Sequence, residues 1–427
     1  MTVEAAAAAI VPDPALPQRD VLFDTAAMRS LFEAFGRCAP ARVDAVTLVR
    51  VNYQVGKSVR VVYRALLDGG THTVAARMFR GGKSAEQHAR ACATAFDVGH
   101  LRGVLRAPAL ESVLWLFPND RKLDTLRSVL DPALLVPGAA APAAVKRLAA
   151  YAPEKSATLA CEDADGRPLA YAKVTASYQA ARDYDTYGAL RAALPPNDRW
   201  LRLPAPLAFD SARRTLWLEA IGGRRLADRA WHDGVDDLRQ LGGAVARFHR
   251  LPADRAPAFD RFSAARLTRD ADIVRSARPD VMFEVDTLVA TLIATAPAED
   301  ETACLHGDIH PKNAIACGDR LALIDVEDVA AGPRAADIGS LIASLLYLRE
   351  GQRLTGVTCA ACVRAFLAGY GSVAAVPEPS ALAWHAAAAL FIERASRAVT
   401  RLRPLGLTHL PQLLGASQHL LDRGLVL

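Results

Sequence analysis

The sequence predicts an α+β protein in which a strand-rich first half is followed by a helical second half. Residues 42–126 and 142–226 alternate apolar and polar side chains in the manner of β-strands, and an Asp-Gly turn interrupts each stretch. After residue 226, apolar residues recur at helical spacing, as in "VDDLRQLGGAVARFHRL" and "AADIGSLIASLLYLRE". We therefore expect a β-rich lobe, a helical lobe and a ligand in the cleft between them.

The two strand-rich stretches share an order of features that predicts an internal repeat. Each contains Tyr-x-x-x-Lys-Ser, as "YQVGKS" and "YAPEKS", and then strands, a helical stretch, Pro-Ala and Leu-Trp-Leu. Chance similarity of two αβ segments is the alternative. The intervening "DPALLVPGAAAPAAVKR" is rich in proline and alanine, which favours a domain boundary there.

The composition argues against several classes of protein. No apolar run of about 18 residues is present, so we expect no membrane span. The net charge of +5 is mild and no basic stripe is interleaved with aromatic residues, so no nucleic-acid partner is expected. Seven scattered cysteines predict reduced thiols and a cytoplasmic location, and Cys359 and Cys362 fit a helix interior better than a metal site. The start has no basic segment before its alanine run, which favours a partly disordered leader over a secretory signal.

The stretch "CLHGDIHPKNAIACGDRLALIDVED", residues 304–328, gathers oxygen ligands around a predicted hairpin at 314–325. Phosphoryl transfer needs cations that neutralise phosphate oxygens and a carboxylate that orients the attacking hydroxyl. Asp308 is placed to accept a hydroxyl proton, Asn313 offers an amide oxygen to a metal, and Asp325 ends the apolar strand with a carboxylate. A solvated loop with ordinary turn residues is the alternative.

The order His-Gly-Asp-x-His-x-x-Asn, then a hairpin and Ile-Asp, resembles the catalytic loop and metal-binding strand of the aminoglycoside phosphotransferase family. That family includes choline kinases and other small-molecule kinases. The resemblance is specific over 304–340, where "GPRAADIGSL" also fits, and extends loosely over 142–427. It implies a bilobal protein-kinase-like fold, with ATP and Mg²⁺ as cofactors.

The resemblance also implies a role for each polar residue of the motif. Asp308 would be the catalytic aspartate, and Asn313 and Asp325 the metal ligands. Asp337 would hold the catalytic loop from the start of a helix, where an anion is favoured.

Two histidines of the loop have open roles. His306 and His310 would brace the loop by hydrogen bonds, or are ordinary, partly buried histidines with satisfied partners.

Lys173 in "LAYAKV" is the residue that the resemblance places against the α- and β-phosphates. It alternates with apolar neighbours, and a charge in that setting is costly unless it is paired. The next helical stretch offers Asp183 or Asp185 as its partner, where family members usually have glutamate. A surface lysine is the alternative.

Two further segments resemble nucleotide contacts of the family. The turn "YAPEKSA" would cover the phosphates, with Lys155 and Ser156 as candidates, although it lacks the G-x-G-x-x-G pattern. The segment "LWLEAIGG", residues 216–223, resembles the strand and hinge whose backbone meets adenine, around Glu219 to Ile221.

The first copy of the repeat is predicted to be a non-catalytic cap. It has Arg77 where the second copy has Lys173, and an arginine fork is not equivalent to a compact ammonium. The predicted domains are therefore a partly disordered leader at 1–40, an N-terminal cap resembling a second N-lobe at 41–140, the nucleotide-binding N-lobe at 141–226 and the helical C-lobe at 227–427.

These observations predict an ATP-dependent phosphotransferase that moves the γ-phosphate to a hydroxyl of a small molecule. The acceptor would be a sugar, an amino alcohol or an aminoglycoside-like compound. The basic segment "ERASRAVTRLRPLG" favours a sugar, an amino alcohol or an anionic metabolite over a polycationic antibiotic. A pseudokinase-like binding or scaffolding module is the alternative, although it has no need of the complete catalytic set.

Overall fold

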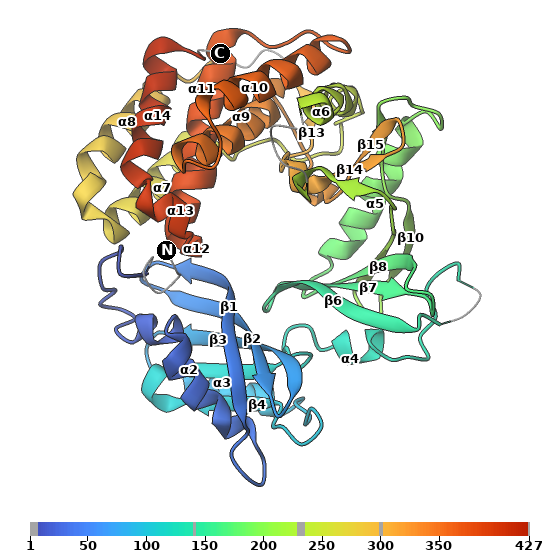
Figure 1. Cartoon of the computed structure of the whole chain (residues 1–427), viewed down its shortest axis with the longest axis vertical. Coiled ribbons are helices and arrows are strands. Elements are labelled where there is room, and N and C mark those ends of the chain that lie inside the picture. Colours follow the sequence, from blue (N-terminus) through green and yellow to red (C-terminus); the bar gives the residue numbers. More distant parts are fainter. Residues whose placement is uncertain (1–6, 140–141, 229–234, 299–301, 426–427) are drawn as a thin grey trace. The chain divides into compact units, whose positions relative to one another are not determined.

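The computed structural model describes residues 7–139, 142–228, 235–298 and 302–425, and these form a mixed α+β protein, as predicted (Figure 1). The chain divides into two compact units. Unit 1 comprises Met1–Ala181, Leu207–Leu218 and Ala398–Leu407, and unit 2 comprises Arg182–Pro206, Glu219–Arg397 and Thr408–Leu427. The predicted domain boundary at residues 140 and 141, and the first six residues of the leader, lie outside the described residues.

Unit 1 contains a first sheet of five strands, in the order β1-β2-β3-β5-β4. All of its neighbouring strands run antiparallel. The helix α3, Ser84–Cys92, connects the third and fourth strands in chain order. The strands are β1 Val43–Gln54, β2 Ser58–Leu67, β3 Gly70–Phe79, β4 Val104–Ala107 and β5 Ser112–Leu116.

A second five-stranded sheet of the same order, β6-β7-β8-β11-β10, also lies mostly in unit 1. The helix α5, Gln179–Ala193, follows β8, just as α3 follows β3. Its strands are β6 Val145–Ala152, β7 Ser156–Glu162, β8 Pro168–Thr175, β10 Pro206–Asp210 and β11 Thr215–Glu219. The identical order of strands and helix is what a repeated unit produces.

The register of the two sheets makes Arg77 and Lys173 equivalent. In the first sheet, Ser58 of the Tyr-x-x-x-Lys-Ser motif lies opposite Phe79, and Arg77 is two residues before Phe79. In the second sheet, the matching serine, Ser156, lies opposite Thr175, and Lys173 is two residues before Thr175.

The two sheets share one hydrophobic core, but they contribute non-equivalent faces to it. The first sheet contributes Ala75 and Phe79. Each is two residues from Arg77 along β3, so all three side chains lie on the same face of the sheet. The second sheet contributes Ala172 and Val174, which alternate with Lys173. Lys173 therefore lies on the face of its sheet opposite to the shared core, as its alternating pattern predicted.

The other face of the first sheet is covered by the described part of the leader. The leader contains η1 Arg19–Leu22, α2 Thr25–Phe32 and η2 Glu33–Phe35, and Asp24 caps α2 by accepting from the backbone of the second and third residues after it. Phe32 is fully buried and its ring lies 5.3 Å from that of Tyr63 on β2. Where the sequence suggested partial disorder, the described residues are packed, because apolar side chains of this segment reach the sheet.

Unit 2 is mainly helical, as predicted for the second half of the chain. Helix α6 packs closely on α10, since a Cβ added at Gly369 would meet the carbonyl oxygen of Arg239 at 1.8 Å. Cys359 and Cys362 are buried in α10, which confirms the helix-interior interpretation. The helices include α6 Val235–Phe248, α7 Ala264–Ala277, α8 Met282–Ala294, α9 Arg334–Glu350, α10 Gly356–Gly371, α11 Pro379–Ala389, the π-helix Leu390–Ser396 and α14 Leu410–Arg423. The shorter α12 Arg397–Arg401 and α13 Pro404–Thr408 belong almost entirely to unit 1. In the described part of the chain, none of the helices has the length and apolar character needed to cross a membrane.

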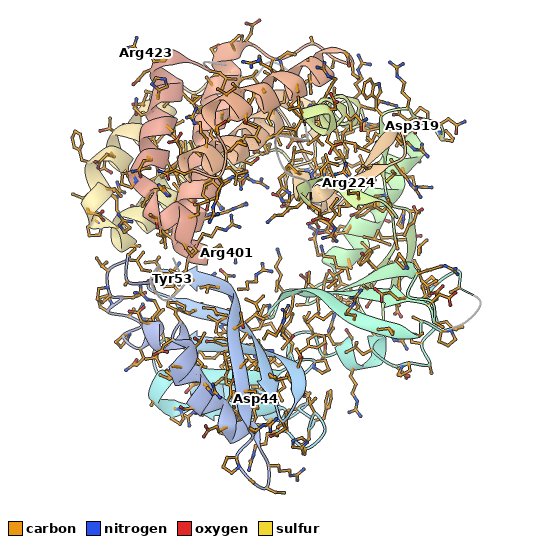
Figure 2. All side chains as sticks on the ribbon, viewed as in Figure 1. Asp44, Tyr53, Arg224, Asp319, Arg401 and Arg423 are labelled. Atoms are coloured by element: carbon orange, nitrogen blue, oxygen red, sulfur yellow. The ribbon has the colours of Figure 1, made fainter. Side chains whose placement is uncertain are left out.

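The predicted hairpin is present as β14 Ala314–Cys317 and β15 Arg320–Leu323. Figure 2 labels Asp319 in its turn and Arg224 on β12, Arg224–Arg225, which pairs with β14. The strand β9, Leu201–Arg202, pairs with β15, and β13 Ala303–Leu305 pairs with β16 Ala330–Gly332. The hairpin was the only strand pair predicted in the second half, because strands of two or three residues are too short to show alternation.

Candidate active site

The loop between β13 and β14 is held by a buried carboxylate. Asp337, in the first turn of α9, accepts hydrogen bonds from the backbone N–H of His306 at 2.7 Å and of Gly307 at 3.0 Å. The N-terminal end of a helix favours an anion at this position. The structural role predicted for Asp337 is therefore confirmed.

His249, directly after α6, also contacts Asp337 and was not singled out in the sequence. Its Nε2 lies 3.1 Å from Asp337 Oδ2, and its Nδ1 lies 2.9 Å from the hydroxyl of Tyr370. Burial raises the pKa of Asp337, but the hydrogen bond and charge of His249 and the contacts of His306 outweigh this and lower the pKa below its ordinary value. Only the position of His249 at the end of an amphipathic helix could have drawn attention to it.

Gly307 allows the loop to pass close to the segment that follows β15. Its φ is 80°, and an added Cβ would meet the carbonyl oxygen of Asp328 at 2.0 Å. A residue with a side chain would be strained here and would also collide with the backbone. The glycine of the His-Gly-Asp motif is therefore required by the local packing.

The structure brings Asp308, Asn313 and the end of β15 into one hydrogen-bond network. The Asn313 side-chain nitrogen donates to the Asp308 carbonyl at 3.0 Å and lies 3.4 Å from its Oδ2. The Ile324 N–H donates to the Asn313 carbonyl at 2.9 Å, and His306 Nε2 lies 3.1 Å from the Ile324 carbonyl. Because Asp325 follows Ile324 directly, these bonds also fix the chain that carries the second carboxylate.

Asp325 has a left-handed backbone conformation, with φ 65° and ψ 47°. Aspartate tolerates this region better than most residues, but a residue other than glycine there still costs on the order of 1 kcal/mol. The next N–H, that of Val326, donates to the hydroxyl of Tyr187 on α5 at 3.3 Å. A strained residue held by its neighbours directly after a strand is typical of functional sites.

The surroundings of Asp308 keep its carboxylate ionised. Burial raises its pKa, but His310, whose Nε2 lies 3.6 Å from Oδ2, and the charges of Arg397 and Arg261 lower the pKa far below the ordinary range. His310 thus contacts Asp308 as an ion pair beyond hydrogen-bond distance, so the bracing of the loop by its hydrogen bonds stays a prediction. Its Nδ1 is buried and has no hydrogen-bond partner among the described residues.

Arg261 is a second residue of the site that the sequence did not indicate. Its guanidinium donates to the Gly307 carbonyl and, at 2.8 Å, to Oε1 of Glu393, and it lies 3.5 Å from Asp328. Glu393 is 2% exposed and lies in the π-helix. The loop is therefore held from two directions, by Asp337 and by Arg261.

Two of the predicted nucleotide contacts lie in unit 1. Lys173 lies in β8, and Ser156 begins β7 after the turn that contains Lys155. The Lys155 carbonyl accepts from the Ala176 N–H at 2.9 Å, so the turn is joined to the end of β8.

The other predicted nucleotide contacts lie in unit 2. In α5, Asp183 is 3% exposed, whereas Asp185 is exposed to solvent. Glu219 ends β11 and pairs with Arg202, and Ile221 follows in a half-buried position. The arrangement of Lys173 and Ser156 around the loop of Asp308 stays a prediction.

The donor set on the loop fits a hard divalent cation. Because the Asn313 nitrogen donates to Asp308, its side-chain oxygen is the atom left to face a metal, and Asp325 contributes a carboxylate. Among the described residues, no group of three or more His, Cys, Asp or Glu could hold a metal alone. Mg²⁺ in such sites usually takes further oxygen ligands from bound phosphates.

Several solved structures resemble part of the chain. The aminoglycoside phosphotransferase APH(3'')-Id from Streptomyces rimosus is 18% identical, with a TM-score of 0.42, over 63% of this chain and 97% of its own. An aminoglycoside-3'-phosphotransferase of type VIII is 23% identical, with a TM-score of 0.43, over 64% and 98%. The macrolide 2'-phosphotransferase MphH from Brachybacterium faecium is 15% identical, with a TM-score of 0.41, over 66% and 93%. No curated protein sequence matches the chain.

A family model gives the decisive comparison. The model described as the phosphotransferase enzyme family matches residues 170–390, which is just over half of the chain. The match begins in β8, before Lys173, and includes the loop of Asp308, the hairpin and Asp337. The chain belongs to the phosphotransferase enzyme family.

Proposed function

We propose that this phosphotransferase is an ATP- and Mg²⁺-dependent kinase that phosphorylates a hydroxyl of a small molecule. The observation that carries the proposal is the network that ties Asp308, Asn313 and the residue before Asp325 into one loop. A phosphoryl-transfer site needs little beyond such positioning and compensation of charge.

Asp308 is the residue that receives the acceptor hydroxyl. Because its pKa lies far below the ordinary range, it is a carboxylate at neutral pH and a weak base. It is therefore better suited to orient the hydroxyl by accepting its hydrogen bond than to remove the proton before the phosphoryl group has moved. The proton passes to Asp308 late, as the new oxygen–phosphorus bond forms.

Asn313 and Asp325 are the residues that would hold Mg²⁺. When bound, the metal supplies positive charge that neutralises the phosphate oxygens. The N–H bonds of Ile324 to Asn313 and of Val326 to Tyr187 hold the backbone on either side of Asp325 before any ligand binds. Such preorganisation reduces the entropy that must be lost during catalysis.

The nucleotide would contact the second sheet and the segment after it. Lys173 would bind the α- and β-phosphates and pair with Asp183, which is the buried one of the two candidate aspartates. Ser156 would lie near the phosphates, and the backbone from Glu219 to Ile221 would meet adenine. On this proposal, residues 41–140 form the cap, 141–226 the nucleotide lobe and 227–427 the helical lobe.

The acceptor is proposed to be a sugar or an amino alcohol rather than a polycationic aminoglycoside. Arg261 and Arg397 both act electrostatically on Asp308, and two cations beside the attacking hydroxyl disfavour a strongly cationic acceptor. The seven scattered cysteines, none of which forms a disulfide in the described part of the chain, favour the reducing environment of the cytoplasm.

Nucleotide binding is tested by thermal denaturation with ATP and Mg²⁺. A ligand at 100 times its Kd stabilises the folded protein by about 2.7 kcal/mol. We expect MgATP to raise the Tm of the wild type more than ATP with EDTA does. In Asp325→Asn, the two conditions should raise Tm by the same amount. Asp319→Asn, in the turn of the neighbouring hairpin, is the matched control and should behave as wild type.

Turnover is tested by ADP release in the presence of sugars, amino alcohols and aminoglycosides. One acceptor class should give ADP and a phosphorylated product, and Asp308→Asn should reduce kcat by about 10²–10⁴-fold while MgATP still binds. Binding of MgATP without product from any acceptor would favour the scaffolding alternative.

A further inference from the structure

The turn between β6 and β7 is attached to the first sheet through a buried carboxylate. Glu154, at the tip of this turn, has a φ of 61° and a side chain that is 2% exposed. Its Oε2 accepts from Arg60 of β2 at 2.9 Å and from Arg77 of β3, and its Oε1 accepts from Arg121 at 2.7 Å. All three arginines belong to the first copy of the repeat.

Arg77 is the counterpart of the lysine that we place on the nucleotide phosphates. It has the register position in the first sheet that Lys173 has in the second. The cation of the first copy therefore binds a carboxylate supplied by the second copy. Its guanidinium also lies over the ring of Phe79, with Cζ 4.7 Å from the centroid.

The face of the first sheet that carries Arg77 is closed to nucleotide. Its neighbours on that face, Ala75 and Phe79, lie in the core shared with the second sheet. A nucleotide would have to displace this core and Glu154 together, which explains physically why the first copy acts as a cap.

A second anchor fixes the backbone of the same turn. Oδ2 of Asp120, which is 2% exposed, accepts from the Tyr151 hydroxyl and from the Glu154 N–H, both at 2.7 Å. The Trp115 indole donates to the same hydroxyl at 2.8 Å. The tip of the turn is thus held by its backbone and by its side chain.

The first copy has the backbone anchor but lacks the carboxylate. There, Oδ2 of Asp13 accepts from the hydroxyl of Tyr53 (labelled in Figure 2) at 2.7 Å and from the Gly56 N–H at 2.8 Å. Gly56 has a φ of 68°, close to that of Glu154. The second copy therefore has glutamate at a left-handed position where glycine suffices, which points to a use for the carboxylate.

The charge of Glu154 is stabilised in the folded protein. Burial raises its pKa, but Arg77, Arg121 and Arg60 outweigh burial and lower the pKa below its ordinary value. Three guanidinium groups around one carboxylate also fix the side chain more tightly than a single ion pair could.

We propose that Glu154 is a positioning residue through which the first copy holds the 152–156 turn in the conformation that receives nucleotide phosphates. The inference rests on the proposed function, since that turn contains Lys155 and leads into Ser156. A turn that is already ordered loses less entropy when the phosphates bind. The cap thereby replaces the glycine-rich pattern that the turn lacks.

The test compares Glu154→Gln with wild type in calorimetric titrations of MgATP. Glutamine keeps the size of the side chain and removes the charge, and we expect Kd for MgATP to rise about tenfold, equivalent to about 1.4 kcal/mol. In turnover assays, KM for ATP should rise while kcat changes less than about twofold. Glu154→Gly, which favours the left-handed backbone, should show the same loss if the carboxylate matters.

Two further variants control for folding. Glu162→Gln removes the outer ion pair with Arg147 on the same hairpin and should bind MgATP as wild type does. Arg121→Gln removes one of the three cations and should give a smaller rise in Kd, which keeps the test valid if Glu154→Gln folds poorly.

Trypsin cleavage after Lys155 gives a readout that is independent of nucleotide. Release of the turn should speed cleavage at this bond in Glu154→Gln but leave it unchanged in Glu162→Gln. Unchanged Kd and unchanged cleavage in folded Glu154→Gln would overturn the positioning role, even if wild type binds ATP. If wild type binds no MgATP, the proposed function fails, and the same cleavage assay still decides whether Glu154 holds the turn.

Discussion

Asp337 accepts three hydrogen bonds from residues that are distant from it in sequence. It is buried, so water cannot take the place of these donors. It is 2% exposed and accepts from the backbones of His306 and Gly307 and from His249. Its role could be predicted because it stands at a helix start beyond the His-Gly-Asp motif. Its dependence on His249 could not, since a contact between residues 88 positions apart leaves no local pattern.

Asp337→Asn should destabilise the protein strongly. The amide puts an N–H₂ group among groups that all donate, and breaking a buried pair costs roughly 3–5 kcal/mol. Urea denaturation should show a loss of about 3 kcal/mol in the free energy of unfolding. The control is Asp328→Asn, whose side chain is 63% exposed and lies 3.5 Å from Arg261, and it should cost less than about 1 kcal/mol. Equal losses in both variants would contradict the special place of Asp337.

His385 should make stability depend on pH below neutrality. It is 1% exposed, and burial lowers its pKa from 6.5 to about 4. Between pH 4 and pH 6.5, His385 is protonated in the unfolded chain but neutral in the folded chain. The neutral, buried histidine therefore costs no stability above pH 6.5, and the free energy of unfolding decreases as the pH falls below that value. The loss should reach about 3 kcal/mol near pH 4, and His385→Gln should flatten this part of the curve in urea titrations at several pH values. An unchanged pH profile in the variant would show that other groups dominate.

Secondary structure elements were predictable where their pattern was long enough to repeat. The hairpin of β14 and β15 and the long helices fall into this class. The strands β9, β12, β13 and β16 do not, because each gains its pairing only from partners elsewhere in the chain. The packing of the leader could not be predicted from its sequence, because its apolar residues have no partner until the first sheet exists.

The crossing of α6 and α10 depends on the glycine at position 369. Gly369→Ala would place a Cβ against the carbonyl of Arg239, which the backbone can relieve only by separating the two helices. We expect a loss of about 1–3 kcal/mol in thermal denaturation, as for an overpacked core. Gly415→Ala in α14 meets nothing within 4 Å, and it should stabilise by up to about 1 kcal/mol because alanine favours the helix. A small effect of Gly369→Ala would mean that the crossing is adaptable.

At the scale of the whole molecule, the sequence indicated the repeat but not the use of its two faces. The shared Tyr-x-x-x-Lys-Ser pattern predicts two similar sheets. It does not reveal that the face bearing Arg77 is packed against the second sheet, because face selection depends on tertiary contacts. The cluster at Glu154 was hidden for the same reason, since Arg60, Arg77 and Arg121 come from separate segments.

The division into two compact units predicts that damage in one unit stays local. Glu154 and its arginines lie in unit 1, whereas Asp337 and His249 lie in unit 2. Hydrogen exchange reports the opening of each unit separately, because protection depends on local and sub-global unfolding free energies. Exchange followed by mass spectrometry should therefore assign each variant to its own unit.

We expect Glu154→Gln to speed exchange in peptides covering 145–175 and to leave those covering 303–324 unchanged. Asp337→Asn should do the reverse, with exchange in 303–324 faster by about 10²-fold, as a loss of about 3 kcal/mol requires. Since neither variant removes a partner of the other, the double variant should show the sum of both effects. An equal increase in exchange rate across both units after either single substitution would instead mean that the chain unfolds as one cooperative unit. The loop of Asp308 and the 152–156 turn would then open with the same free energy.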